Sequence, residues 1–219
     1  MTSLDQLYYN SSMRTKNASD GQKRPSFIEA ARRTQIIECA IETIATLGYA
    51  QASLAQIARR AGISKSVITY YFGSKEELIE QVVEGMYTAA TSFMRPQIAA
   101  ERTAAARLQS YLRSNVAYIA AHRLQMMAII EIVLNVRTKD GQLRYHPGSE
   151  KSDLEGLEAI LRQGQDEGEF RSFDLRVMAV TIRGAIDAVG RFLVAHPALD
   201  GETYAQELVT LFDRATRKE

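Results

Sequence analysis

The stretch Leu54–Phe72, LAQIARRAGISKSVITYYF, decides how the rest of this chain is organised. Its first half places apolar residues at the spacing of one helix face, and Ser53 precedes it as a candidate cap. We expect the Ser53 hydroxyl to accept the Gln56 N–H, and the Gln56 amide to reach back to the Ser53 N–H. Gly62 predicts a left-handed helix end, and Ser64 is placed to cap a second helix. Two short helices joined by so brief a turn predict a helix-turn-helix, whose second helix enters the major groove of DNA.

The second helix, residues 65–72, has an inner and an outer face. The spacing of Ile68, Tyr71 and Phe72 directs them inward. The outer residues suit base edges, thymine methyl groups and phosphates. Lys75 follows at the start of a third helix, and a helix N-terminus beside a lysine suits a phosphate. The candidate DNA-binding residues are Ser53, Ser64, Lys65, Ser66, Val67, Thr69, Tyr70 and Lys75.

The segment from Arg33 to Glu84 resembles the DNA-binding domain of the TetR/AcrR family of transcriptional regulators. The family pattern runs through IA..AG(V/I)SK into (L/I)Y.(H/Y)F and then K..L, and this chain reads IARRAGISKSVITYYFGSKEEL at the same spacing. Thr69 stands where the family has its first tyrosine, so we expect Tyr70 to make the phosphate contact instead. The resemblance implies a homodimeric repressor that binds a palindromic operator in double-stranded DNA and is released by a small apolar or aromatic effector.

The helical pattern divides the chain into regions and predicts an all-α fold. Residues 1–25 have no helical period and are typical of a disordered basic tail, which is either solvated or an arm for the minor groove. Residues 26–73 would form the three-helix DNA-binding domain. Residues 74–219 would form a larger helical domain for ligand binding and dimerisation, with a connecting helix at 74–95 that Pro96 ends.

Composition and charge favour a globular protein with a local basic region. Hydrophobic residues make up 46% of the chain and charged residues 24%, with a formal net charge of +1. Eight basic residues lie between Lys23 and Lys75 against three acidic ones, so positive charge is concentrated around the motif. A single cysteine, Cys39, excludes an intrachain disulfide. Without a signal segment or a membrane-length apolar run, we expect a cytoplasmic protein with no membrane partner. We also expect no cofactor and no metal.

The second half of the chain carries Met and aromatic side chains on apolar helices. Such side chains suit a pocket for varied apolar molecules, but the same spacing is typical of ordinary core packing, and both interpretations remain open. Glu131 and Asn135, one turn apart, either face solvent or contact a polar group of the effector, because burying an unpaired carboxylate is costly. The candidate pocket residues are Met86, Tyr87, Phe93, Met94, Tyr111, Tyr118, Met126, Met127, Ile130, Glu131 and Asn135.

The helix expected at residues 174–195 combines small residues with a ladder of charges. Small residues permit close helix approach, and the charges could pair along or across helices. In the resembled family, the last two long helices of each subunit form a four-helix dimer bundle. An exposed face with intrahelical ion pairs explains the ladder equally well. The dimer-interface candidates are Arg183, Gly184, Asp187, Ala188 and Arg191.

Two other classes of protein compete with a ligand-responsive regulator. An architectural DNA-binding protein without a ligand would have a filled second domain and no sequence preference. An enzyme is the weaker alternative, because His122, His146 and His196 are far apart in the sequence. The chain also lacks the HExxH and GxSxG motifs and a phosphate-binding glycine loop. We therefore expect no catalytic residues.

Overall fold

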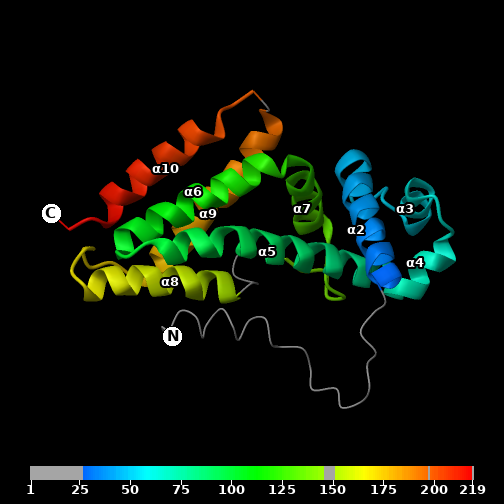
Figure 1. Ribbon diagram of the computed structural model, residues 1–219, viewed down its shortest axis with the longest axis horizontal. Coiled ribbons are helices and arrows are strands. Elements are labelled where there is room, and N and C mark those ends of the chain that lie inside the picture. Colours follow the sequence, from blue (N-terminus) through cyan, green and yellow to red (C-terminus); the bar gives the residue numbers. More distant parts are fainter. Residues whose placement is uncertain (1–26, 146–150, 197, 219) are drawn as a thin grey trace, which may run out of the picture. The chain divides into compact units, whose positions relative to one another are not determined.

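The computed structural model describes residues 27–145, 151–196 and 198–218, and within these ranges the fold is all-α, as predicted (Figure 1). The tail at residues 1–25 lies outside the described residues. Isolated antiparallel bridges join Arg137 to Leu143 and Phe170 to Arg217. The helices run in the order α2 (Phe27–Leu47), α3 (Leu54–Ala61), α4 (Lys65–Phe72), α5 (Lys75–Ala100), α6 (Ala104–Ala121), α7 (Arg123–Asn135), α8 (Lys151–Asp166), α9 (Leu175–Ala195) and α10 (Gly201–Thr216).

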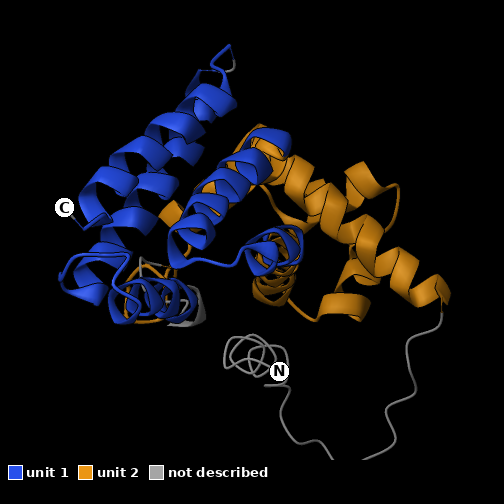
Figure 2. Cartoon of the chain, turned by 60° about the vertical axis from the view of Figure 1, so that its left-hand side comes forward, with its two compact units in different colours: residues 1–19, 91–121, 146–219 blue, residues 20–90, 122–145 orange. Residues whose placement is uncertain are grey.

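The chain forms two compact units, which Figure 2 colours separately. Of the described residues, unit 2 comprises 27–90 and 122–145, and unit 1 comprises 91–121, 151–196 and 198–218. This division differs from the boundary that the sequence suggested before the connecting helix. The physical reason is that α7 packs against α2 and contributes side chains to the core of the helix-turn-helix.

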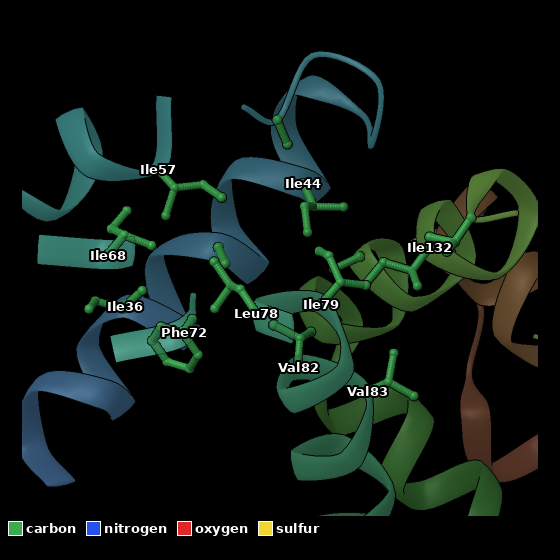
Figure 3. Packing of buried hydrophobic residues seen from close by; sticks show 14 of the residues in the cluster. Ile36, Ile44, Ile57, Ile68, Phe72, Leu78, Ile79, Val82, Val83 and Ile132 are labelled. Carbon is green, nitrogen blue, oxygen red and sulfur yellow. The ribbon is translucent and has the colours of Figure 1, made fainter. Parts of the chain in front are cut away.

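Unit 2 is built around one apolar core to which five of its helices contribute (Figure 3). Ile36 from α2, Ile57 from α3, Phe72 from α4, Leu78 from α5 and Ile132 from α7 are all fully buried there. Burying an apolar side chain of this size contributes about 1.5 to 3 kcal/mol. The helix-turn-helix therefore shares its stability with α5 and α7.

Helix α5 contributes to both units and continues through Pro96 to Ala100. We expected it to end at Pro96, and that expectation is wrong. Proline removes one backbone donor from a helix, which leaves only the carbonyl of Ser92 without its usual partner. The Pro96 ring is exposed, and Gln97 Nε2 donates to the Phe93 carbonyl at 2.8 Å in the same turn. A surface position thus accommodates the proline.

Unit 1 packs α6 against α8, α9 and α10. Acidic side chains cap helices of this unit, as α9 and α6 illustrate. Asp174 accepts the Val177 N–H at 2.8 Å at the start of α9. Glu169, between α8 and α9, accepts the N–H groups of Ala104 and Ala105 at 3.1 and 2.9 Å, at the start of α6. These carboxylates satisfy donors that the first helical turn leaves free.

No single helix in the described part of the chain is long and apolar enough to cross a bilayer, although the broken pair Ala104–Ala121 and Arg123–Asn135 meets the length and composition criteria together.

Candidate nucleic-acid interface

Helix α3 begins and ends as its sequence predicts. Ser53 is the N-cap, and its Oγ accepts the Gln56 N–H at 3.3 Å. Gly62 has a φ of 65°, in the left-handed region, and its N–H donates to the Arg59 carbonyl. The expected bond from the Ser53 N–H to the Gln56 amide is not formed, so that prediction is wrong. The Gln56 side chain instead accepts from Arg59, and the Ser53 N–H donates to the Gln51 carbonyl. The serine bond alone caps this helix.

Helix α4 presents the two faces that its spacing predicts. Ile68 and Phe72 are fully buried, and Tyr71 is half-buried. The outer face of α4 is therefore accessible and could enter the major groove of a DNA duplex. Of the candidate DNA contacts, the exposed ones are Ser53, Ser64, Lys65, Ser66 and Tyr70, and the half-buried ones are Val67, Thr69 and Lys75.

Ser64 holds the N-cap position of α4, but its side chain makes no capping hydrogen bond. Its Oγ lies 2.8 Å from Ser66 Oγ, so the two hydroxyls are bonded to each other. The expected side-chain cap is therefore wrong, because a neighbouring hydroxyl competes for it. Both hydroxyls lie at the N-terminus of α4, where the partial positive charge of a helix end favours an anion such as a phosphate.

Tyr70 is the most exposed aromatic residue of the motif, with 78% of its surface accessible. Its ring meets the half-buried ring of Tyr71 edge to face, with centroids 5.2 Å apart. The hydroxyl of Thr69 instead donates to the Ser66 carbonyl of its own helix at 3.0 Å. The Tyr70 phenol is thus freer than the Thr69 hydroxyl to reach a phosphate, and that contact stays a prediction.

The half-buried side chain of Lys75 contacts the turn that follows α2. Its Nζ donates to the Tyr49 carbonyl at 3.1 Å and lies 4.2 Å from the centroid of the Tyr49 ring. Burial lowers the pKa of Lys75, against a smaller opposing effect of Glu76, and burial raises the pKa of the Tyr49 phenol. This geometry ties the start of α5 to the turn after α2 and does not favour the phosphate contact expected for Lys75.

Glu131 is half-buried and has a partner within the chain. Its Oε2 accepts the backbone N–H of Tyr49 at 3.0 Å, so the carboxylate holds the turn that follows α2. Asn135 is exposed, and its Nδ2 donates to the Glu131 carbonyl at 2.8 Å. An unpaired polar group in an apolar helix suggested a ligand contact, but the partner is a backbone group from a distant part of the chain.

The structure divides the pocket candidates between the two units. Met86 is buried in the unit 2 core and Met126 packs against it, as ordinary core residues do. In unit 1 the rings of Phe93 and Tyr118 lie 5.7 Å apart, and burial raises the pKa of the Tyr118 phenol. The unit 2 candidates are Met86, Tyr87, Met126, Met127, Ile130, Glu131 and Asn135, and the unit 1 candidates are Phe93, Met94, Tyr111 and Tyr118.

The charged ladder of α9 pairs within unit 1. Arg183 donates to Asp187 Oδ1 from Nε and Nη2, at 2.9 and 2.7 Å, and its Nη1 lies 3.3 Å from Asn115 Oδ1 on α6. Arg183 and Asp187 therefore make the intrahelical pair that was the alternative interpretation. Arg191 and Gly184 are exposed and Ala188 is half-buried, and all three remain interface candidates.

Two residues of α2 contact the motif although the sequence did not single them out. Arg33 Nη1 donates to the Tyr71 carbonyl, and Gln35 Nε2 donates to the Ala61 carbonyl. The signal for Arg33 was its position three residues before the buried Ile36, which puts a charged side chain on the inner face of α2. A charged residue in such a position requires a partner.

Comparisons with known proteins give a consistent picture. The family model described as "Bacterial regulatory proteins, tetR family" matches residues 36–82. The chain is 29% identical over 171 residues to the fatty acid metabolism regulator protein of Bacillus subtilis, covering 76% of this chain and 82% of that protein. The fold resembles that of FadR from Bacillus halodurans, with a TM-score of 0.72 at 23% identity over 88% of this chain and 97% of that one. The structure of FadR from Bacillus subtilis in complex with stearoyl-CoA matches with a TM-score of 0.70 at 25% identity, over 81% of this chain and 96% of that one.

Proposed function

This chain belongs to the tetR family of bacterial regulatory proteins, and from that premise we propose that it is a homodimeric repressor released from a palindromic operator by a small molecule. It is a DNA-binding transcriptional regulator and not an enzyme. The observation that carries the proposal is the geometry of α3 and α4, with a left-handed turn at Gly62 and the outer face of α4 exposed.

Each α4 would lie in the major groove of one operator half-site. In a two-fold dimer the two recognition helices enter successive grooves, so their separation would be about 34 to 36 Å. Val67 and Ser66 suit base edges and thymine methyl groups, whereas the Lys65 ammonium and the Tyr70 hydroxyl suit phosphates. Phosphate contacts would supply affinity that falls with salt, and base contacts would supply the sequence preference.

The proposed dimer surface is the exposed side of α9. Val177 and Val180, one turn apart, expose 66% and 45% of their surface, which is high for valine on an amphipathic helix. Gly184 continues the stripe, and a Cβ added there would meet nothing within 4 Å. A small residue between apolar ones permits the backbone of a second copy to approach closely, which suits a two-fold helix pair.

The proposed effector is a long-chain acyl-CoA or a molecule with similar apolar and charged parts. The name of the Bacillus subtilis relative and the stearoyl-CoA bound in its structure support this class. Phe93 on α5 and Tyr118 on α6 form an aromatic pair, and with the buried Tyr111, also on α6, they offer apolar surface suited to an acyl chain. Release of DNA requires only that the effector prefer the released state, and a hundredfold preference is worth about 2.7 kcal/mol.

A fluorescence titration tests the proposal. The purified protein first selects duplexes from a randomised library and is then titrated with the selected duplex and with a scrambled duplex over a range of salt concentrations. We expect at least about a thousandfold preference and a steep salt dependence. Stearoyl-CoA should then release the DNA, with free CoA and stearate as controls. Binding that ignores sequence would instead indicate an architectural DNA-binding protein.

A further inference from the structure

Two side chains of α2 bind the C-terminal ends of α3 and α4, the two helices of the helix-turn-helix. Gln35 Nε2 donates to the carbonyl of Ala61, the last residue of α3, at 3.3 Å. Arg33 Nη1 donates to the carbonyl of Tyr71, in the last turn of α4, at 2.5 Å. The last four carbonyls of a helix have no partner within the helix, so both acceptors are groups that need an external donor.

Further contacts fix the direction of these two donors. The guanidinium carbon of Arg33 lies 4.4 Å from the centroid of the fully buried Phe72 ring, so the side chain is held over the C-terminus of α4. A cation there also meets the negative end of the helix dipole. Arg32 Nη1 donates to Gln35 Oε1 at 2.7 Å, which turns the amide nitrogen of Gln35 toward Ala61.

We propose that Arg33 and Gln35 are positioning residues that set the angle between α3 and α4 and thereby the sequence discrimination of the protein. The inference rests on the proposed DNA-binding function. Helix α4 has only eight residues, and its apolar anchors Ile68 and Phe72 resist separation but have little directional preference. Hydrogen bonds to charged donors are directional and about twice as strong as neutral ones. The Tyr71 carbonyl is also adjacent to Tyr70, the proposed phosphate contact.

The experiment compares Arg33→Met with Arg33→Lys and with Lys139→Met. Methionine keeps an apolar stem over Phe72 but removes the donors, and lysine keeps one donor and the charge. Lys139 is an exposed lysine of unit 2, so Lys139→Met removes the same charge without touching the motif. Each protein is titrated with the duplex that the wild type selects from a randomised library and with a scrambled duplex, over a range of salt concentrations.

We expect Arg33→Met to lose about tenfold in affinity for the selected duplex and little for the scrambled one, with the slope against salt unchanged. Arg33→Lys should recover part of that loss, and Lys139→Met should keep the wild-type ratio of the two affinities. Gln35→Met should lower the same ratio, because it releases the end of α3. Amide exchange of residues 65–72 should become faster in Arg33→Met while that of α6 is unchanged, which separates a local effect from loss of folding.

Other results would overturn the inference. If Arg33 contacts a phosphate directly, Arg33→Met weakens both duplexes alike and lowers the salt slope by about 0.9. An unchanged ratio in a folded Arg33→Met protein would show that the core alone orients α4. If the wild type selects no sequence at all, the proposed function fails and the positioning role fails with it, whereas a selective wild type with selective variants contradicts only the positioning role.

Discussion

Glu131 and Tyr49 lie 82 positions apart in the chain and are joined by a hydrogen bond of 3.0 Å from the Tyr49 N–H to Glu131 Oε2. The carbonyl of the same tyrosine accepts from Lys75 Nζ at 3.1 Å. Both backbone polar groups of Tyr49 are therefore held by side chains from other helices, its N–H by α7 and its carbonyl by α5. A Cβ on the preceding Gly48, whose φ is 78°, would lie 3.3 Å from the Glu131 carboxylate. The turn after α2 is thus fixed by contacts from two distant segments.

Removing the acceptor at Glu131 should destabilise unit 2. Glu131→Leu leaves the Tyr49 N–H without its partner, and we expect a loss of about 1 to 3 kcal/mol in the free energy of unfolding. Glu131→Gln is the matched control, because its amide oxygen can still accept. Urea unfolding followed by circular dichroism measures both. Equal losses in the two variants would mean that the charge, and not the hydrogen bond, matters at this position.

A methyl group at Gly164 should be poorly tolerated in unit 1. A Cβ there would lie 2.1 Å from Cδ2 of Phe170, a ring that is itself buried. Gly164→Ala should therefore destabilise by about 1 to 3 kcal/mol, because the ring has to move within a packed core. Gly85→Ala in α5 meets nothing within 4 Å and should stabilise by about 0.5 to 1 kcal/mol. Thermal unfolding of the two variants gives the comparison, and a neutral Gly164→Ala would indicate that Phe170 repacks freely.

The two proposed classes of DNA contact should separate by mutation. Tyr70→Phe removes a hydroxyl proposed to bind a phosphate and should weaken binding to selected and scrambled duplexes alike, by about 1 kcal/mol. Val67→Ser should instead change the preferred base at one operator position, by about 1 to 3 kcal/mol. Selection from a randomised duplex library reads out both variants. A Tyr70→Phe protein that lost discrimination at one position only would assign Tyr70 to base reading.

The dimer surface should be sensitive to charge on the exposed side of α9. Val180→Glu places a carboxylate on the proposed interface and should shift the protein toward monomer, because two such charges would face each other across a two-fold axis. Arg183→Met should leave the association unchanged but cost about 1 to 3 kcal/mol of stability, since it leaves Asp187 and Asn115 without this partner. Analytical ultracentrifugation distinguishes the two. A monomeric Arg183→Met protein would return the charged ladder to the interface.

The start of α10 should weaken in acid. The Thr203 hydroxyl donates to Asp200 at 2.7 Å, and this bond, followed by those from the Glu202 and Thr203 N–H groups, lowers the pKa of the Asp200 carboxyl from its ordinary value of 3.8. The folded state therefore favours the charged form. Its contribution to stability is fully present above the ordinary pKa and is lost as the pH falls through the lowered pKa.

The difference in melting temperature between wild type and Asp200→Asn, followed with pH, tests this expectation for α10. Asparagine keeps a capping oxygen but does not titrate, so the advantage of the wild type should shrink only in acid. A difference that stays constant across the acid range would mean that the hydrogen bonds at Asp200 do not depend on its charge.

Local interactions determined what the sequence predicted correctly. The start of α3 at Ser53, its left-handed end at Gly62 and the buried face of α4 at Ile68 and Phe72 all depend on residues within a few positions of one another. Helix period, a capping hydroxyl and a glycine with positive φ are set by the chain itself, so a sequence alone specifies them. The resemblance to a family of regulators rested on the same short segment.

Only the tertiary structure decided which groups the charged side chains bind. The sequence showed where on its helix each of four charged residues lies, but the partners that the structure shows come from elsewhere in the fold. These residues are Glu131, Lys75, Arg183 and Arg33. A desolvated charge binds whichever group the fold brings within about 3 Å, and that distance depends on how helices distant in sequence pack. Tertiary packing also placed α7 side chains in the core of unit 2. The hydrophobic effect depends on the apolar area that is buried and not on its position along the chain.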